Sequence, residues 1–280
     1  MSAALVLVAT PIGNLGDIST RAVEELEQAD LVCCEDTRRT GRLLAHLAIQ
    51  ARMRRADDHT ENAVAAEVIE LLESGQRVVL VSDAGTPGIS DPGQRLVELV
   101  VEAGFDVTTV PGPSAAVAAL VASGLSTSRF VFDGFLDRKG GGRHRQLADI
   151  ATQPRTSIIY ESPNRTAATL RDLAEVCSPD RLAVVARELT KLHEEIVRGS
   201  LAELIAWADL GVRGEVVILV SGCAPRAAAT DEEILEAVNS EIASGASRRD
   251  AVASVSEALE VGRRRVYELA LAADDSSSNE

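Results

Sequence analysis

Three turns rich in glycine and proline constrain the fold of this chain more strongly than any other feature. Each turn follows a short β-like run and precedes a helix-like segment; the pairs are 4–8 with 9–17, 78–81 with 83–93, and 107–110 with 111–116. β-like runs that alternate with amphipathic helices predict a mostly parallel sheet. Ligands of such sheets bind beyond the carboxyl ends of the strands. The three turns therefore predict one ligand cleft.

The same pattern divides the 280 residues into domains. We expect an α/β domain over 1–124 and a second α/β domain over 125–223, in which the runs 194–198 and 216–220 are candidate antiparallel partners. Three short helical patterns predict a trihelical domain of helix-turn-helix type over 230–273. The polar residues 274–280 predict a disordered tail. The predicted fold class is α/β with a small helical appendage.

Two local signals predict where helices begin. Asp91 and Pro92 form a favourable helix start, with Asp as N-cap and Pro in the first turn. Ser114 is a natural N-cap for a helix over 115–122. The basic, glycine-rich segment 138–145 has the composition of a mobile loop.

Charge and cysteine content exclude several classes of protein. The formal net charge of -15 opposes nucleic-acid binding through bulk electrostatics, although a local basic face is still compatible with it. The four cysteines, Cys33, Cys34, Cys177 and Cys223, lack metal-ligand spacing, so we expect buried thiols and no metal site. No stretch approaches the ~20 apolar residues of a membrane span, which predicts a cytoplasmic protein.

Two common nucleotide-binding motifs do not occur. There is no G-x-G-x-x-G after the first strand and no G-x-x-x-x-G-K-[ST], which disfavours dinucleotide-binding and P-loop domains. The glycines at 85, 88 and 93 instead let the backbone approach a ligand closely. Such a loop can offer N–H and C=O groups to an adenosine and a methionyl tail.

Six short motifs carry a resemblance to a known family. They are Pro11–Leu15, Glu35–Arg38, Ser82–Pro87, Pro111–Pro113, Tyr160–Ser162 and Ala186–Lys191. Together they closely resemble the bacterial 16S ribosomal RNA (cytidine-2′-O)-methyltransferases I of the tetrapyrrole-methylase superfamily. The resemblance extends from about residue 5 to residue 220. Relatives that methylate tetrapyrroles begin with G-x-G-P-G-D, whereas this chain has Pro11-Ile12-Gly13-Asn14, which favours the RNA branch.

The resemblance implies a function and a site. It implies two α/β domains with S-adenosylmethionine bound between them, a cytidine ribose of 16S rRNA in the small ribosomal subunit as substrate, and a homodimer. The residues that it implies for the cofactor are Pro11, Ile12, Asp83, Ala84, Gly85, Thr86, Pro87, Ser114, Ala115, Glu161, Leu189, Gly214 and Glu215.

Ribose methylation requires a group that removes the proton of the 2′-hydroxyl. The carboxylates of Glu35, Asp36, Glu161 and Glu188 are candidates, and Lys191 could serve if desolvation lowered its pKa. An alternative interpretation of residues 35–38 is a capped helix start with a surface ion pair. The choice among these bases is open at this point.

Arginines supply the candidate RNA contacts, because a guanidinium suits phosphate oxygens. The positions are Arg38, Arg39, Arg138, Arg143 and Arg145, with the 138–145 loop as the main candidate. Each cluster alone is also typical of a solvated surface. Two rival functions are a small-molecule methylase of tetrapyrrole type and a non-catalytic RNA-binding module that uses the C-terminal helices.

Overall fold

The expected parallel sheet forms the first part of the chain. In the computed structural model, which describes residues 4–57, 60–223, 229–259 and 261–277, five strands lie in the order β3-β2-β4-β1-β5 and every adjacent pair is parallel. These strands are β1 (Ala4–Val8), β2 (Leu31–Cys34), β3 (Met53–Arg55), β4 (Val78–Val81) and β5 (Asp106–Val110). The sequence pattern missed β3, because a short polar strand at the edge of a sheet has no apolar run.

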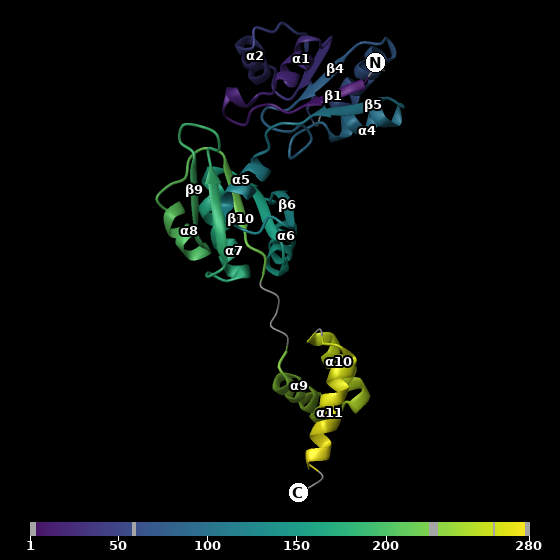
Figure 1. Cartoon of the computed structure of the whole chain (residues 1–280), viewed down its shortest axis with the longest axis vertical. Helices are drawn as coiled ribbons and strands as arrows, with labels where there is room; N and C mark the ends of the chain where they lie inside the picture. The colour runs from purple at the N-terminus through teal and green to yellow at the C-terminus, as the bar shows by residue number, and fades with distance from the viewer. Residues whose placement is uncertain (1–3, 58–59, 224–228, 260, 278–280) are drawn as a thin grey trace. The chain divides into compact units, whose positions relative to one another are not determined.

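Helices cover both faces of this sheet (Figure 1). α1 (Thr20–Glu27) and α2 (Thr37–His46) pack on one face, and α3 (Glu61–Glu73) and α4 (Gln94–Glu102) on the other. The neighbouring strands β1 and β4 are therefore followed by helices on opposite faces of the sheet. A crevice opens at such a point beyond the carboxyl ends of the strands. The turns after β1 and β4, with the short helix η1 (Leu15–Asp17), lie there.

The predicted start of the fourth helix was wrong. α4 begins at Gln94 with Gly93 as its N-cap, so Asp91 and Pro92 lie before the helix. The buried carboxylate of Glu61 accepts the hydrogen bond of the Gly93 N–H group. A side chain from another helix thus provides the cap that the local sequence assigned to Asp91, so the Asp91 carboxylate does not cap α4.

A mixed sheet forms the second part. Its strands are β6 (Phe130–Phe135), β7 (Thr156–Glu161), β8 (Leu182–Arg187), β9 (Glu195–Ser200) and β10 (Val216–Val220), in the order β6-β7-β10-β8-β9. β6 and β7 are parallel, and the other pairs are antiparallel. The runs predicted at 194–198 and 216–220 are both antiparallel strands, but each pairs with β8, which lies between them, and they do not pair with each other.

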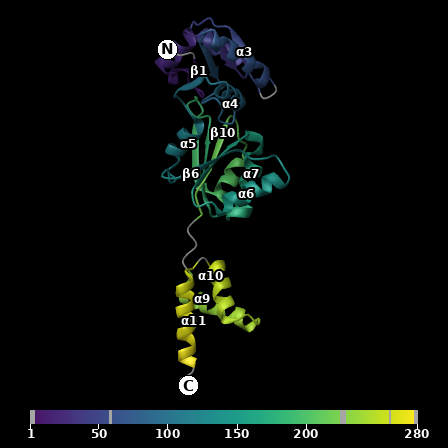
Figure 2. The same cartoon turned by 90° about the vertical axis from the view of Figure 1, so that its right-hand side faces the viewer.

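Figure 2 shows helices on both sides of the second sheet. α6 (Gly141–Thr152), α7 (Pro163–Cys177) and α8 (Leu201–Ala208) bury one face. α5 (Ala115–Ser123) packs on the other face, although the sequence pattern groups this helix with the first domain. Ile12, from the first turn, joins the same apolar cluster. Ile12 thus links the first turn to the core of the second sheet.

The basic segment 138–145 differs from its prediction as a loop. α6 begins at Gly141, and Arg143 is only 8% exposed. The Arg143 guanidinium donates to the carboxylate of Asp172, the hydroxyl of Thr169 and the carbonyl of Asp137. Arg143 is therefore a structural residue that joins α6 to α7, and its assignment as an RNA contact was wrong. Arg138 and Arg145 are exposed.

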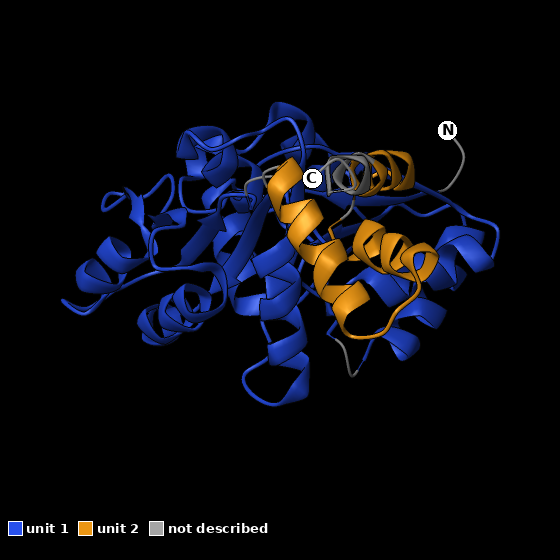
Figure 3. Cartoon of the chain, turned by 90° about the horizontal axis from the view of Figure 1, so that it is seen from below, with its two compact units in different colours: residues 1–223 blue, residues 224–280 orange. Residues whose placement is uncertain are grey.

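The chain divides into a unit of residues 1–223 and a unit of residues 224–280, coloured separately in Figure 3. The second unit contains the three expected helices, α9 (Asp231–Ala243), α10 (Arg248–Ala258) and α11 (Arg263–Ser277), around a core of its own. α11 continues through 274–277, where the sequence predicted disorder, and 278–280 lie outside the described residues. In the part of the chain that the structure describes, no helix is both long and apolar enough to span a membrane.

Candidate active site

The three turns meet as the sequence predicted, because hydrogen bonds join them. Thr10 and Gly85 exchange both backbone hydrogen bonds, with N···O distances of 2.8 and 3.0 Å. The Thr86 hydroxyl donates to the carbonyl of Pro113 at 3.3 Å. Gly85 has φ +84°, and a Cβ there would lie 3.3 Å from the side chain of Ile12. Glycine is therefore required where the second turn passes the first.

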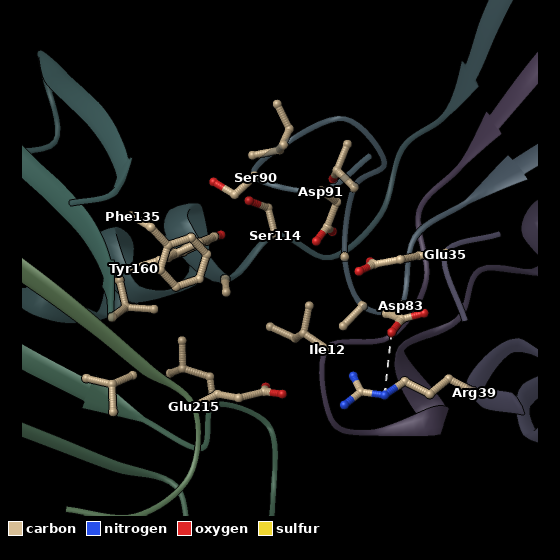
Figure 4. A pocket seen from close by; sticks show the side chains of 18 of the residues that line it. Ile12, Glu35, Arg39, Asp83, Ser90, Asp91, Ser114, Phe135, Tyr160 and Glu215 are labelled. Atoms are coloured by element: carbon tan, nitrogen blue, oxygen red, sulfur yellow. Dashed lines mark ion pairs between the residues drawn. The ribbon is translucent and has the colours of Figure 1, made fainter. Parts of the chain in front are cut away.

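These turns border a pocket of about 920 Å³ between the two sheets (Figure 4). The region before α5 contributes Ile12, Glu35, Asp36, Thr37, Arg38, Arg39, Arg55, Asp83, Ala84, Gly85, Thr86, Ile89, Ser90, Asp91 and Ser114. α5 and the second sheet contribute Ala115, Phe135, Tyr160, Glu161, Ser162, Pro163, Leu189, Gly214, Glu215, Val216 and Val217. Every predicted cofactor residue except Pro11 and Pro87 lines the pocket. Their binding role stays a prediction.

Asp36 and Asp83 fix the wall of the pocket that is formed by the segments after the parallel strands. Asp36 is the N-cap of α2: it accepts the Arg38 N–H group at 2.8 Å and pairs with the Arg38 guanidinium. The hydrogen bonds from Arg38 keep the pKa of Asp36 below its usual range, which argues against Asp36 as the base. Asp83 accepts the Asp36 N–H group at 3.0 Å and lies 3.5 Å from the Nε atom of Arg39.

Asp91 is the functional candidate that the sequence reasoning missed. Its side chain lines the pocket near Glu35 and Asp83 (Figure 4). Burial raises the pKa of Asp91 to about 6, and the negative charges of Glu35 and Asp83 act in the same direction. A carboxylate with a pKa near neutrality can both take up and release a proton under working conditions. The only sequence signal was a helix-cap pattern, which pointed to a different role.

Glu161, the last residue of β7, lines the pocket from the second sheet. It is 3% exposed and accepts hydrogen bonds from the Thr169 hydroxyl at 2.6 Å and from the Ser162 N–H group at 2.8 Å. The guanidinium of Arg165 lies 3.4 Å from its Oε2 atom. Because both carboxylate oxygens are engaged by the protein, Glu161 fits a structural role in the wall better than proton transfer.

Glu188 and Lys191, which do not line the pocket, form an ion cluster with Glu215, which does. The Lys191 ammonium lies 2.7 Å from Glu188 Oε1 and 3.0 Å from Glu215 Oε2. Partial burial alone would lower the pKa of Lys191, but the hydrogen bonds and charges of these two carboxylates outweigh it and raise the pKa. The hydrogen bond from Lys191 lowers the pKa of Glu188. The geometry therefore contradicts the desolvated lysine base and disfavours Glu188.

Tyr160 anchors the apolar wall. Its hydroxyl accepts the N–H group of Ala116 at 3.1 Å, close to the start of α5. Ser114 is the N-cap residue of α5 as predicted, but its side chain makes no capping hydrogen bond. Leu189 and Val217 continue this wall, and both are buried. The residues before α5 supply all the arginines and most of the carboxylates of the lining, and the second part supplies its aromatic rings together with Glu161 and Glu215.

The predicted RNA-contact arginines fall in different places. Arg38 and Arg39 line the pocket and are exposed, whereas Arg138 and Arg145 lie outside its lining. Arg55, which also lines the pocket, pairs with Asp57 at 2.9 Å. Among the described residues, no group of three or more His, Cys, Asp or Glu side chains could hold a metal ion.

Comparisons with known proteins agree with this architecture. The chain is 44% identical to the "Ribosomal RNA small subunit methyltransferase I" of Synechocystis sp., over 95% of this chain and 97% of that protein. It is 43% identical to the protein of that name from Mycobacterium tuberculosis (96% and 95% covered) and 49% identical to the one from Xylella fastidiosa (80% and 83% covered).

Solved structures show the same fold at lower identity. The methyltransferase CobJ is 23% identical with a TM-score of 0.62, over 81% of this chain and 98% of that one. A uroporphyrin-III-C-methyltransferase from Thermus thermophilus is 20% identical with a TM-score of 0.57, over 78% and 94%. The model of the family Tetrapyrrole (Corrin/Porphyrin) Methylases matches residues 4–205. The chain therefore belongs to the tetrapyrrole methylases and, by its identity to these relatives, to the family of the ribosomal RNA small subunit methyltransferases I.

Proposed function

We propose that this protein transfers a methyl group from S-adenosylmethionine to the ribose 2′-oxygen of a cytidine in 16S rRNA of the small ribosomal subunit. The observation that carries the proposal is the pocket itself: three hydrogen-bonded turns at the carboxyl ends of β1, β4 and β5 face the second sheet across one cavity. The relatives at 43–49% identity bear the name of this enzyme class.

The lining residues fit the cofactor. The backbone of Gly85 and the buried side chains of Ile12 and Leu189 suit an adenosine, because they combine apolar surface with backbone polar groups. The carboxylates that line the same pocket suit its amino group and sulfonium charge. When bound, S-adenosylmethionine supplies an electrophilic methyl group. The protein residues then orient the ribose and accept its proton.

Asp91 is our candidate for the proton acceptor. Of the carboxylates considered, Asp36 and Glu188 have lowered pKa values, and Glu161 is engaged on both oxygens. Asp91 alone among these has a pKa raised toward neutrality, and it faces the pocket. Glu35, which lines the same wall, helps to keep that pKa high through its charge. The proton of the 2′-hydroxyl would pass to the Asp91 carboxylate as the new O–CH₃ bond forms.

Local arginines suit the RNA despite the overall negative charge. Arg38 and Arg39 lie at the pocket, and Arg138 and Arg145 follow β6 on the other side. Contact at several separate patches favours a shaped substrate, since all patches must engage together. We therefore expect the assembled small subunit to be a better substrate than a naked oligonucleotide with the same cytidine. Such a substrate places the enzyme in the cytoplasm.

A homodimer is also part of the proposal. α5 is apolar all round, yet Val117 is 49% exposed and Val121 is 68% exposed on its outer side. A helix of this composition is normally covered. A second copy of the chain would cover it, and analytical ultracentrifugation of the wild type and of a Val121→Glu variant tests this.

Labelled methyl transfer tests the function directly. We expect the protein to label small subunits isolated from a strain that lacks the enzyme, and nuclease mapping to place the label on a cytidine 2′-oxygen. A methyl group on a base, or no transfer to subunits, would contradict the proposal. The rival tetrapyrrole methylase has less support, because no observation in the pocket favours it over RNA. Labelling of a precorrin in the parallel assay would instead support the tetrapyrrole-methylase function.

A further inference from the structure

An irregularity in β6 turns Phe135 toward the pocket. In a regular strand, residues three apart point to opposite faces, so Phe132 and Phe135 would lie on different sides of the sheet. The register shifts between Phe132 and Gly134: Phe132 pairs with Ile158, and Phe135 pairs with Tyr160. This bulge puts Phe135 on the same face as Phe132. Bulges occur often beside active sites, where they redirect a side chain.

The bulge also depends on a glycine. Gly134 has φ +62°, and a Cβ at this position would lie 3.2 Å from the Ser90 hydroxyl in the second turn. The bulge therefore satisfies two requirements at once, since it allows a close approach between the two halves of the site and it redirects the next side chain. Leu136 then returns to the buried core on the other face of the sheet.

Three aromatic rings gather at this point. Phe132 and Phe135 each contact Tyr160 edge to face, with centroids 4.9 and 5.6 Å away. The chain has only four Phe, two Tyr and one Trp, so such a cluster is unlike the aliphatic cores elsewhere. Phe135 lines the pocket and is 55% exposed. A large apolar ring half open to solvent inside a pocket is an unfilled contact surface.

We propose that Phe135, supported by Tyr160, is the surface on which the base of the target nucleotide stacks; this rests on the proposed RNA function. Aromatic faces bind unpaired bases of RNA by stacking. The exposure of Phe135 favours the incoming base over the adenine of the cofactor, because Ile12 and Leu189, at the predicted cofactor positions, are 7% and 8% exposed. In Figure 4 Asp91 lies between the aromatic pair and Glu35. Because Phe135 and Asp91 line the same pocket, a base stacked on Phe135 would keep its ribose in the cavity that Asp91 also lines.

Three substitutions at one position test the stacking. We expect Phe135→Ala and Phe135→Leu to lower kcat/KM on small ribosomal subunits by about 5- to 100-fold, the range for loss of one base–aromatic stack. Phe135→Trp should keep activity near that of the wild type. Leu retains apolar volume without a ring face, so a loss of activity in Phe135→Leu separates stacking from packing. Calorimetric affinity for S-adenosylmethionine should stay unchanged in all three. A parallel loss of cofactor affinity would overturn the proposal.

Phe130→Ala is the matched control, because Phe130 is an exposed phenylalanine of the same strand that lies outside the pocket lining. We expect it to leave activity unchanged. An equal loss in this variant would show a general effect on β6 and would overturn the stacking role.

A binding measurement separates this inference from the proposed function. In the Phe135→Trp, Trp207→Phe double variant, we expect cytidine 5′-monophosphate at millimolar concentration to quench the fluorescence, also when S-adenosylhomocysteine is saturating. Quenching only in the absence of S-adenosylhomocysteine, or none at all, would overturn the proposal. Failure of the wild type to methylate small subunits, with this quenching intact, would instead reject the RNA function alone.

Discussion

The two walls of the pocket differ in chemistry and in how they are held. The acidic wall, formed by Glu35, Asp36, Asp83 and Asp91, comes from the turns of the parallel sheet and is fixed by hydrogen bonds and ion pairs. The apolar wall, formed by Phe135, Tyr160, Leu189 and Val217, comes from the mixed sheet and is fixed by packing. We infer from this difference a division of labour: charge and proton transfer on one wall, and positioning on the other.

The largest effect is expected on the acidic wall. We expect Asp91→Asn to lower kcat by about 100- to 10,000-fold, because general-base catalysis contributes a factor of this size. The wild-type kcat should fall about tenfold for each pH unit below about 6, where the raised pKa of Asp91 leaves the carboxyl protonated. Single-turnover methylation across pH 5–8 measures both. A variant that keeps the activity and pH profile of the wild type would remove Asp91 from the mechanism.

The next largest effect is expected on cofactor affinity, where Gly85 of the second turn contacts Ile12 of the first. Gly85→Val should weaken S-adenosylmethionine binding by about 100-fold, since a β-branched residue at positive φ is strained and its side chain meets Ile12. Gly88→Val is the matched control, because Gly88 has φ +80° and a Cβ added there would meet no described atom within 4 Å. Calorimetric titration compares the two. Equal losses of affinity would attribute the effect to backbone strain rather than to the pocket.

The next prediction compares two arginines of α6, Arg143 and Arg145, and its expected effects are smaller. Arg143→Ala should lower the free energy of unfolding by about 2 kcal/mol, because it removes hydrogen bonds to Asp172, Thr169 and Asp137. Arg145→Ala should leave stability almost unchanged and lower the log–log salt slope of RNA affinity by about 0.7 to 0.9. Urea unfolding and filter binding at several salt concentrations measure these effects. An unchanged slope for Arg145→Ala would make it an ordinary surface residue.

The smallest expected effect is a gain in stability. The pKa of Asp91 is higher in the folded protein than in the unfolded chain, so the folded state loses stability as the pH rises through about 6. Asp91→Asn removes this penalty and should raise the Tm at pH 8 by about 2 °C. At pH 4 the difference should largely disappear. A Tm that falls at pH 8 would show that the carboxylate stabilises the fold.

Much of the fold could be predicted because its signals are local. The runs of β1, β4 and β10 were predicted with their observed bounds, and the three C-terminal helices were predicted within 230–273, since apolar periodicity and capping residues act over a few positions. Most cofactor positions also line the pocket as expected. The motifs that carry them lie at strand ends, where any open parallel sheet places its ligand.

The tertiary structure alone decided which charged and aromatic residues face the pocket. Arg143 is neutralised by Asp172 on another helix, and the cap that Asp91 was expected to provide comes from Glu61. Burial, and then the charges of Glu35 and Asp83, raise the pKa of Asp91, and both the burial and these neighbours exist only in the folded chain. The bulge at Gly134 moves Phe135 to a face that strict alternation excludes. Local sequence determines elements and turns, whereas burial and long-range electrostatics depend on groups that become neighbours only when the chain folds.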